Sequence, residues 1–301
     1  MTVLKAKSKS RALIQGKETK ELLSRSLKYL KSGYPVHFTG PSGAGKTSLA
    51  LALAKKRKRP VMLIHGNHEL NNNDLIGGFT GYTSKKVVDQ FVRSVYKKEE
   101  NVSETWRDGR LLQAVKHGYT LVYDEFTRSR PTTNNIFLSI LEEGILPLYG
   151  TKLTEPFIRV HPEFSVIFTS NPLEYAGVYD TQDALLDRMI TIFLQYQNSE
   201  EEAQILTEKT GLDQKETKMI TKLVANLRGQ CTTNKNNGPS LRASLMIASL
   251  AFEEDISIDG EDQRFQQLCI DVLSHPVSRC LKTEDPKADA EKMIIDECKS
   301  I

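Results

Sequence analysis

Three polar clusters in the sequence have the residue types and spacing that chemistry on a phosphate ester needs. The first, GPSGAGKT, matches G-x-x-x-x-G-K-[ST] at every fixed position. Its glycines let successive backbone N–H groups point at phosphate oxygens, and the helix that follows presents the positive end of its dipole. Lys46 then reaches the outer phosphates, and the Thr47 hydroxyl can hold Mg²⁺. The predicted phosphate site is Gly40, Pro41, Ser42, Gly43, Ala44, Gly45, Lys46 and Thr47.

The second cluster is a pair of adjacent acids, Asp124 and Glu125, that closes the apolar run LVY. A phosphate site with magnesium needs an acid at the tip of a neighbouring strand, so we assign Asp124 to Mg²⁺, through water. Beside a magnesium-bound triphosphate, Glu125 can polarise the water that attacks the γ-phosphate, which predicts hydrolysis rather than transfer to an acceptor. The alternative is that Glu125 is a solvated strand end.

The third cluster is IFTSNP, in which Asn171 directly follows an apolar run. Its side chain could hydrogen-bond the attacking water or the γ-phosphate. Asparagine before proline is also a common turn. The position beside the other two strand ends favours the site.

The elements that must hold these clusters are short apolar strands separated by helical stretches. A strand over 35–39 leads into the glycine loop, and a strong helix former follows over 48–55. Near-continuous apolar strands of this kind suit a parallel sheet covered on both faces, so the fold class is an α/β P-loop domain. The other predicted strands are 61–64, 120–123, 164–169 and 190–194, with helices over 111–116 and 135–143 between them.

The character of the chain changes near residue 197, after which it shows helical stretches without clear strands. We therefore predict an α/β domain with the phosphate site over 17–197 and a small all-helical domain over 198–301. Residues 1–16 are expected to form a loose basic arm, with a basic binding tail as the alternative.

Bulk composition excludes several classes of protein. With 301 residues, 39% hydrophobic and 26% charged, the chain is typical of a soluble globular protein, and its net charge of +3 is too small to indicate a nucleic-acid partner. We find neither a secretory signal nor eighteen consecutive apolar residues, which predicts a cytoplasmic protein without membrane insertion. The four cysteines lack C-x-x-C spacing, so no disulfide framework or zinc site is expected and a reducing compartment fits best.

Taken together, the motifs resemble those of an AAA+ ATPase, with GPSGAGKT as Walker A, LVYDE as Walker B and Asn171 as sensor 1. The acidic pair followed by FTRSRP resembles the MoxR branch of that class. More closely, five runs resemble the gas vesicle protein N (GvpN) family. These runs cover most of residues 11–195 and are YPVHFTG, VMLIHG, HGYTLVYDEFTRSRP, FTSNPLEYAG and TQDALLDR.

The resemblance implies ATP and Mg²⁺ as cofactors and a ring-shaped homo-oligomer, expected to be a hexamer, with ATP between subunits. Arg188 then resembles the arginine finger that reaches a neighbour's γ-phosphate, although a salt bridge to Asp187 or Asp183 is the alternative. Arg242 resembles the sensor 2 arginine of the helical lid, the part that the resemblance assigns to residues 198–301. It could act on either its own or the adjacent nucleotide.

Arg128 and Arg130 follow the acidic pair at the edge of the predicted nucleotide site. They are candidates for an interface that couples one subunit's ATP to its neighbour, against the alternative of a solvated turn.

Other segments are less specific. The span 79–105 is longer than a typical MoxR hairpin and is expected to project towards the ring axis or a partner, while 145–160 predicts two short strands around a Tyr-Gly turn. The run KKRKR suits the C-terminal end of the P-loop helix. His65 and His68 have no third ligand nearby, so metal binding is not expected.

The function that the resemblance implies is ATP hydrolysis that assists assembly or remodelling of the gas vesicle shell, with shell or accessory proteins as partners and the gas vesicle as a place of attachment. Two alternatives stay open. One is an ATP-binding, weakly hydrolysing component of the vesicle, and the other is a MoxR-type chaperone for another client complex.

Overall fold

The structure, a computed structural model, describes residues 16–86, 100–148, 155–171, 177–231 and 238–301. Its α/β part contains a five-stranded parallel sheet in the order β2-β5-β8-β1-β9. The strands are β1 (Val36–Thr39), β2 (Val61–His65), β5 (Thr120–Asp124), β8 (Ser165–Ser170) and β9 (Ile190–Phe193). Each predicted strand is therefore present, with its ends shifted by one residue or less, and the predicted fold class is confirmed.

Alternate residues along each strand point to opposite faces of the sheet. Both faces are buried, each by its own apolar core. Val122 and Ile167 join the core under α1 and α2, whereas Tyr123 and Phe168 join the core on the other face. The helices of this part are α1 (Lys17–Lys31), α2 (Lys46–Lys56), α3 (Asn72–Ile76), α4 (Arg110–His117), α5 (Pro131–Asn134), α6 (Ile136–Glu142) and α7 (Asp183–Leu186), with a 3₁₀ turn at Phe126–Arg128.

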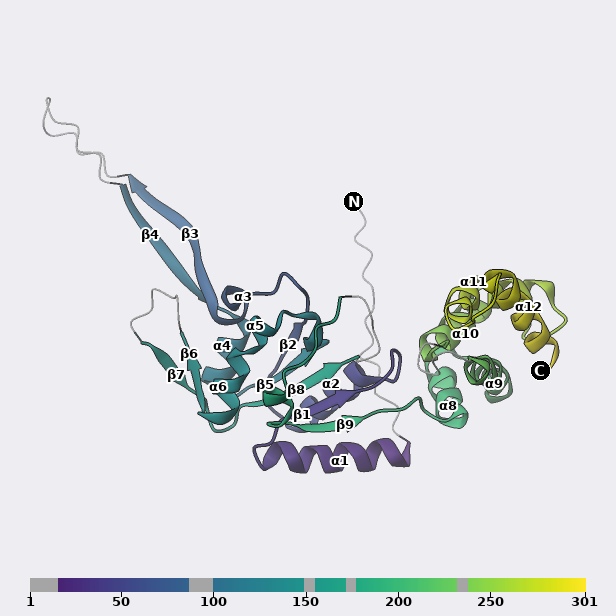
Figure 1. The fold of residues 1–301 in the computed structure, drawn as a ribbon, viewed down its shortest axis with the longest axis horizontal. Coiled ribbons are helices and arrows are strands. Elements are labelled where there is room, and N and C mark those ends of the chain that lie inside the picture. The colour runs from purple at the N-terminus through teal and green to yellow at the C-terminus, as the bar shows by residue number, and fades with distance from the viewer. Residues whose placement is uncertain (1–15, 87–99, 149–154, 172–176, 232–237) are drawn as a thin grey trace, which may run out of the picture.

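Two antiparallel hairpins extend the α/β part. The span that the sequence marks as an insertion forms β3 (Gly77–Lys86) and β4 (Glu100–Asp108), a ribbon that projects away from the sheet and from the helical part (Figure 1). The strands β6 (Ile145–Pro147) and β7 (Phe157–Arg159) form the second hairpin. The predicted Tyr-Gly turn between them lies outside the described residues.

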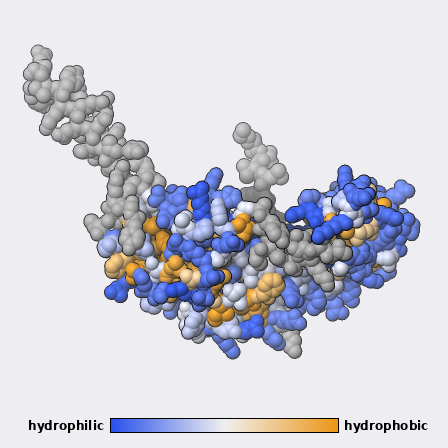
Figure 2. All heavy atoms as spheres, viewed as in Figure 1, coloured by the Kyte–Doolittle hydropathy of each residue, from blue (hydrophilic) through white to orange (hydrophobic). Residues whose placement is uncertain are grey.

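After β9 the described chain is helical, with α8 (Ser199–Thr210), α9 (Gln214–Gln230), α10 (Leu241–Glu253), α11 (Gln263–Ser278) and α12 (Pro286–Lys299). These helices pack around their own apolar core and lie to one side of the α/β part (Figure 1). On the face seen in Figure 2, hydrophobic residues gather mainly over the α/β part, while the helical part is mainly hydrophilic. The division at residue 197 stays a prediction, as does the basic arm, of which all but Gly16 lies outside the described residues.

The expectation of no disulfide is wrong. Cys231, at the end of α9, is bonded to Cys280, just after α11, across 49 residues of sequence. The spacing could not reveal this pair because the two residues meet only through the packing of separate helices. The cysteine argument for a reducing compartment therefore fails. Cys269 and Cys298 are free and buried.

Within the described part of the chain, no helix is long and apolar enough to cross a membrane.

Candidate functional site

The glycine loop joins β1 to α2 at the carboxyl edge of the sheet. Gly40 has φ +144°, and a side chain there would meet the Leu194 carbonyl at 2.2 Å. Gly43 has φ +81°, and a Cβ atom there would lie 2.5 Å from Cβ of Ser240. The loop is therefore enclosed by the chain that leaves β9 and by the start of α10, and both positions require glycine.

Lys46 is held at the centre of this loop. It is 9% exposed, and its Nζ donates to the carbonyl oxygens of Gly40, at 2.9 Å, and Pro41, at 2.7 Å. The ammonium group is thus held by the carbonyls of the glycine loop, beside the N-terminus of α2, where the helix dipole favours an anion.

Asp124 is the centre of a buried hydrogen-bond network. Thr47 Oγ1 donates to its Oδ1 at 2.7 Å and Thr169 Oγ1 donates to the same oxygen at 2.6 Å. Thr169 Oγ1 also accepts a hydrogen bond from the backbone N–H of Glu125 at 2.9 Å. The network therefore joins the glycine loop, the end of β5 and the end of β8. Thr169 was not identified from the sequence, although it lies two residues before Asn171 at the same strand end.

His65 is a second residue that the sequence did not assign to the site. It ends β2 in register with Asp124, and its Nδ1 lies 3.3 Å from Asp124 Oδ2. The available signal was a polar residue at the tip of a strand next to β5, but strand order cannot be read from the sequence alone.

Glu125 is presented by an unusual backbone. Its φ of +52° lies in the left-handed region. Gly66 lies against the Glu125 backbone, and a Cβ atom at Gly66 would meet the Glu125 carbonyl oxygen at 2.1 Å. Strained backbone of this kind is typical of functional sites. The carboxylate pairs with Arg128, whose Nε lies 2.8 Å from Glu125 Oε2. Both side chains are more than a third exposed, so solvent can reach the Glu125 carboxylate.

Asn171 follows β8 directly and is buried, at the same sheet edge as Asp124 and Glu125. The segment 172–176 of the FTSNPLEYAG run lies outside the described residues.

A magnesium ion fits the donors at this edge. Thr47 and Asp124 bring a hydroxyl and a carboxylate together beside the glycine loop, and Mg²⁺ takes such oxygens with substrate phosphates and water completing its shell. Among the described residues, no cluster of three or more His, Cys, Asp or Glu side chains could hold a metal alone. The donor set therefore suits a metal that arrives with a nucleotide.

Two arginines that the sequence singled out lie away from this network. Arg188 pairs with Glu142, through Nε at 3.1 Å and through a second guanidinium nitrogen, and also donates to the Ala184 carbonyl. The salt bridge therefore goes to Glu142 and not to Asp183 or Asp187. Arg130 is exposed at the start of α5.

Arg242 lies in the first turn of α10, beside the glycine loop. Its backbone N–H donates to Oγ of the N-cap residue Ser240 at 3.3 Å. Because Ser240 packs on Gly43, Arg242 is two residues from a direct contact with the phosphate loop.

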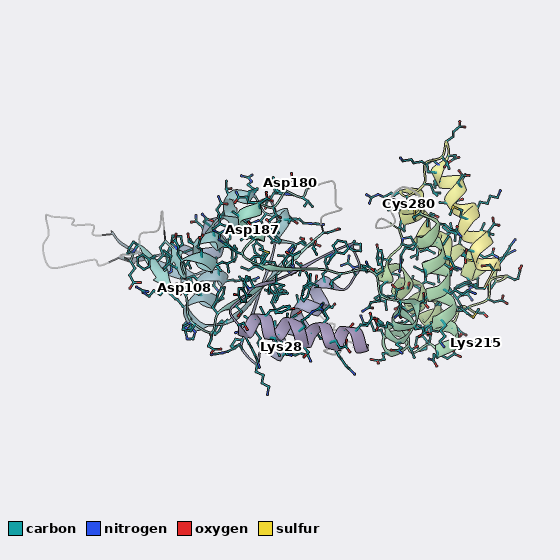
Figure 3. All side chains as sticks on the ribbon, turned by 60° about the horizontal axis from the view of Figure 1, so that its bottom comes forward. Lys28, Asp108, Asp180, Asp187, Lys215 and Cys280 are labelled. Atoms are coloured by element: carbon teal, nitrogen blue, oxygen red, sulfur yellow. A yellow bond between two sulfur atoms is a disulfide. The ribbon has the colours of Figure 1, made fainter. Side chains whose placement is uncertain are left out.

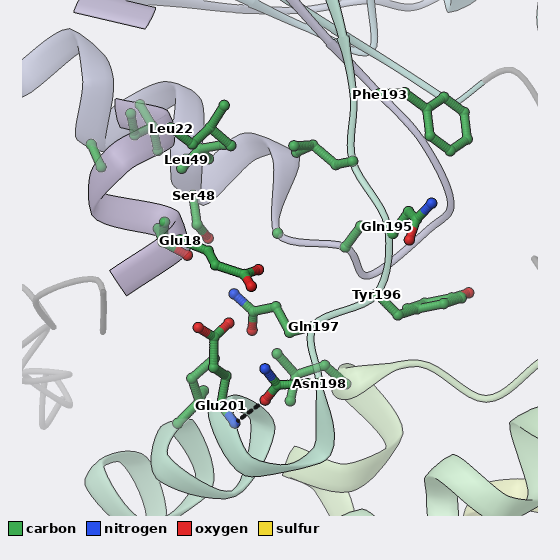
Figure 4. A pocket seen from close by; sticks show the side chains of 18 of the residues that line it. Glu18, Leu22, Ser48, Leu49, Phe193, Gln195, Tyr196, Gln197, Asn198 and Glu201 are labelled. Carbon is green, nitrogen blue, oxygen red and sulfur yellow. Dashed lines mark hydrogen bonds between the residues drawn. The ribbon is translucent and has the colours of Figure 1, made fainter. Parts of the chain in front are cut away.

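A cavity of about 1040 Å³ adjoins the glycine loop at Ala44 and Gly45. It is lined by both parts of the chain, including Glu18, Ser48, Leu49, Gln197, Glu201 and Leu241. Figure 4 shows Glu18, Gln197 and Glu201 directed towards one another, and Gln197 Oε1 is buried without a hydrogen bond from the described residues. Burial, and then the nearby Glu18 carboxylate, raises the pKa of Glu201. The cavity is large enough for a base and ribose and carries a free acceptor oxygen.

Comparison with known proteins identifies related sequences. A family model described as "AAA domain (dynein-related subfamily)" matches residues 35–189. The chain is 45% identical to "Gas vesicle ATPase GvpN" of Ancylobacter aquaticus over 260 residues, which covers 86% of this chain and 72% of that protein. It is 35% identical to the protein of the same name from Haloferax mediterranei, covering 93% of this chain and 79% of that one.

Among solved structures, a RuvB mutant from Thermotoga maritima superposes with a TM-score of 0.50 at 16% identity, covering 81% of this chain and 66% of that one. At this identity the match shows the fold alone.

Proposed function

The chain belongs to the GvpN family of gas vesicle ATPases, and from that premise we propose that its ATP hydrolysis assists assembly or remodelling of the gas vesicle protein shell. The observation that carries the catalytic half of this proposal is the network that joins Thr47, Asp124, Thr169 and the backbone of Glu125. This network brings the glycine loop, the Thr47 hydroxyl beside the Asp124 carboxylate, and the exposed Glu125 side chain to one sheet edge, which supports the proposal.

In this proposal the phosphates of ATP lie in the loop from Gly40 to Thr47, against the backbone N–H groups. Lys46 transfers its ammonium hydrogen bonds from the loop carbonyls to the outer phosphates, which supply stronger charge-assisted acceptors. The base and ribose lie in the adjoining cavity, where the free Gln197 oxygen can accept a hydrogen bond from an exocyclic amine.

The Thr47 hydroxyl and, through water, Asp124 would hold magnesium, which when bound would offset negative charge on the phosphates. Glu125 accepts a proton from the water that attacks the γ-phosphate, and its exposed carboxylate is open to that water. Asn171 orients the same water or the γ-phosphate. The products are ADP and inorganic phosphate.

We assign the arginines to a homo-oligomeric ring, with a hexamer as the expected form. Arg188, oriented by Glu142 and the Ala184 carbonyl, would reach the γ-phosphate of the neighbouring subunit. Arg242 would contact the nucleotide as the helical part closes on it, since its helix starts against the glycine loop. Arg128 and Arg130 would transmit the state of Glu125 to the subunit interface.

The β3–β4 ribbon is the element best placed to act on a partner. It projects from the α/β part, away from the helical part (Figure 1). We propose that ATP-driven closure moves this ribbon against shell or accessory proteins of the vesicle, in the cytoplasm and in association with the vesicle.

A complementation experiment tests the vesicle half of the proposal. The gene is deleted in a gas-vesicle producer and replaced by the wild type, by Lys46→Ala or by the surface control Lys28→Ala, and vesicle size is measured by electron microscopy. We expect full-sized vesicles with the wild type and the control, and small or absent vesicles with Lys46→Ala. Full-sized vesicles with Lys46→Ala, at equal expression, would overturn any role for the nucleotide.

A further inference from the structure

Arg228, in α9, makes one of the densest sets of polar contacts among the described residues outside the nucleotide site. Its NH1 and NH2 groups donate to the two carboxylate oxygens of Glu202, in α8, at 3.0 and 3.3 Å. Its Nε donates to the carbonyl oxygen of Pro239, just before α10, at 2.8 Å. Its guanidinium carbon lies 4.3 Å from the ring centre of Tyr196. We call these four residues the Arg228 junction.

The junction lies where the two parts of the chain are connected. Tyr196 belongs to the short segment between β9 and α8, which begins with Leu194, whose carbonyl packs on Gly40. Pro239 precedes Ser240, which packs on Gly43. Arg228 thus contacts both segments that enclose the glycine loop, the one that leaves the sheet and the one that begins the helix carrying Arg242.

The local sequence is adapted to this contact. Gly238 approaches Arg228 so closely that a Cβ atom there would lie 3.2 Å from both Cα and Cγ of the arginine. A side chain at this position would crowd Arg228 and the Cys231 sulfur, which lies 3.1 Å from the same Cβ position.

Burial indicates that the junction does more than add stability. The Glu202 side chain is 2% exposed and that of Arg228 is 11% exposed. The free-energy cost of removing two charges from water offsets most of their mutual attraction, so a buried ion pair is a weak source of stability. The bidentate geometry of an arginine–carboxylate pair nevertheless fixes the relative position of the two groups that it joins.

We propose that the Arg228 junction is a positioning element that couples the connecting segment to the start of α10, so that the helical part moves over bound ATP as one body with Arg242 in register. Arg228, Glu202 and Tyr196 act as positioning residues in this proposal. Tyr196 is among the residues that line the cavity, but its ring is directed away from Glu18, Gln197 and Glu201 (Figure 4). The inference rests on the proposed closure of the helical part on ATP.

The stacking contact offers a test that leaves the buried ion pair in place. Tyr196→Leu removes the ring face under the guanidinium, whereas Tyr196→Phe keeps it. Each variant is made in a protein carrying spin labels at Lys28→Cys and Lys215→Cys, which are exposed positions in α1 and α9 (Figure 3). The distance between the labels is measured with and without the β,γ-imido analogue of ATP, together with kcat, analogue affinity and thermal unfolding.

In the wild type we expect the analogue to shift the label distance and narrow its distribution. Tyr196→Leu should blunt that shift and lower kcat about tenfold, with analogue affinity within about twofold of wild type, because misplaced groups cost rate more than ground-state binding. Tyr196→Phe should restore both the shift and kcat. A merely structural role for the ring would lower the unfolding temperature without separating kcat from affinity.

Three outcomes overturn the inference. A folded Tyr196→Leu protein with wild-type kcat and a wild-type shift in label distance would contradict the proposed coupling. So would a Tyr196→Phe protein whose kcat and label shift fall as far as those of Tyr196→Leu. If the wild type shows no analogue-dependent shift, the closure itself fails, and the junction has nothing to couple. Normal closure in the wild type with an unaffected Tyr196→Leu variant leaves the proposed closure standing and removes the junction alone.

Discussion

Arg128 Nε lies 2.8 Å from Glu125 Oε2, so the first arginine after β5 contacts the carboxylate that we propose as the catalytic base. The two residues are three positions apart on the 3₁₀ turn that follows the strand. From this pairing we predict that Arg128 orients Glu125 within its own subunit, in addition to its proposed role at the interface.

Removing Arg128 should therefore slow hydrolysis without weakening ATP binding. For Arg128→Ala we expect kcat to fall about tenfold with an unchanged dissociation constant for ATP, since only the orientation of Glu125 is lost. Steady-state phosphate release and nucleotide titration measure the two quantities. The matched control is Arg59→Ala, which removes an arginine from an exposed pair with Glu163. Equal loss of affinity and rate would indicate misfolding instead.

Thr169 should be needed for its hydroxyl and not for its shape. Thr169→Val keeps the volume but deprives the buried Asp124 Oδ1 of a donor and the partly buried Glu125 N–H of an acceptor. We expect a loss of about 1–3 kcal/mol in the free energy of unfolding and slower hydrolysis. Chemical denaturation and phosphate release test this, with Thr169→Ser as the variant that should resemble wild type. A wild-type Thr169→Val protein would show that the network is incidental.

His37 should make the fold sensitive to acid. It is buried in β1, with Nε2 2.8 Å from Ser170 Oγ and Nδ1 3.1 Å from Thr191 Oγ1, and burial lowers its pKa to about 4. In the unfolded chain His37 takes up a proton near pH 6.5, whereas in the folded chain it stays neutral until about pH 4. The contribution of neutral His37 to the free energy of unfolding is therefore complete above pH 6.5 and is lost as the pH falls to 4. The loss amounts to about 3 kcal/mol over that window.

Denaturation curves of wild type and His37→Asn between pH 4 and pH 7 isolate this contribution. The difference in unfolding free energy between the two proteins should shrink as the pH falls. Parallel pH profiles would show that His37 does not titrate in this range.

The disulfide between Cys231 and Cys280 should stabilise the helical part. Closing a loop of this length is worth about 2–4 kcal/mol through the unfolded chain. Reduction with dithiothreitol should therefore lower the unfolding temperature of the wild type and leave that of the Cys231→Ser, Cys280→Ser double variant unchanged. An identical response of the two proteins to the reductant, or four free thiols in the untreated wild type, would contradict the bond.

The sequence predicted those features that depend on local pattern. Apolar runs predicted the five strands because a strand buried on both faces is apolar along its length. The spacing in GPSGAGKT, between a strand and a helix, predicts a phosphate loop because its glycines let the backbone wrap around phosphate oxygens. The resemblance of five sequence runs predicted membership of the GvpN family, which the relatives confirm. The roles of Glu125, Asn171, Arg188 and Arg242 stay predictions, and the Glu125→Gln variant described below addresses the first of them.

The features that the sequence did not predict are contacts between residues far apart in the chain. Glu142 pairs with Arg188 across 46 residues, His65 meets Asp124 only because β2 lies next to β5, and Cys231 meets Cys280 through helix packing. Such pairs depend on strand order and packing, which no local period encodes. The β3–β4 ribbon was missed as strands because its polar residues lack the apolar pattern of the central sheet.

The central claim is that Glu125 activates the attacking water at a site built on Asp124. The most direct measurement is steady-state phosphate release by wild type and Glu125→Gln at saturating ATP, with gas vesicle shell and accessory proteins present. We expect Glu125→Gln to bind ATP as the wild type does and to release phosphate at least about a hundredfold more slowly. Equal release by the two proteins would contradict the account.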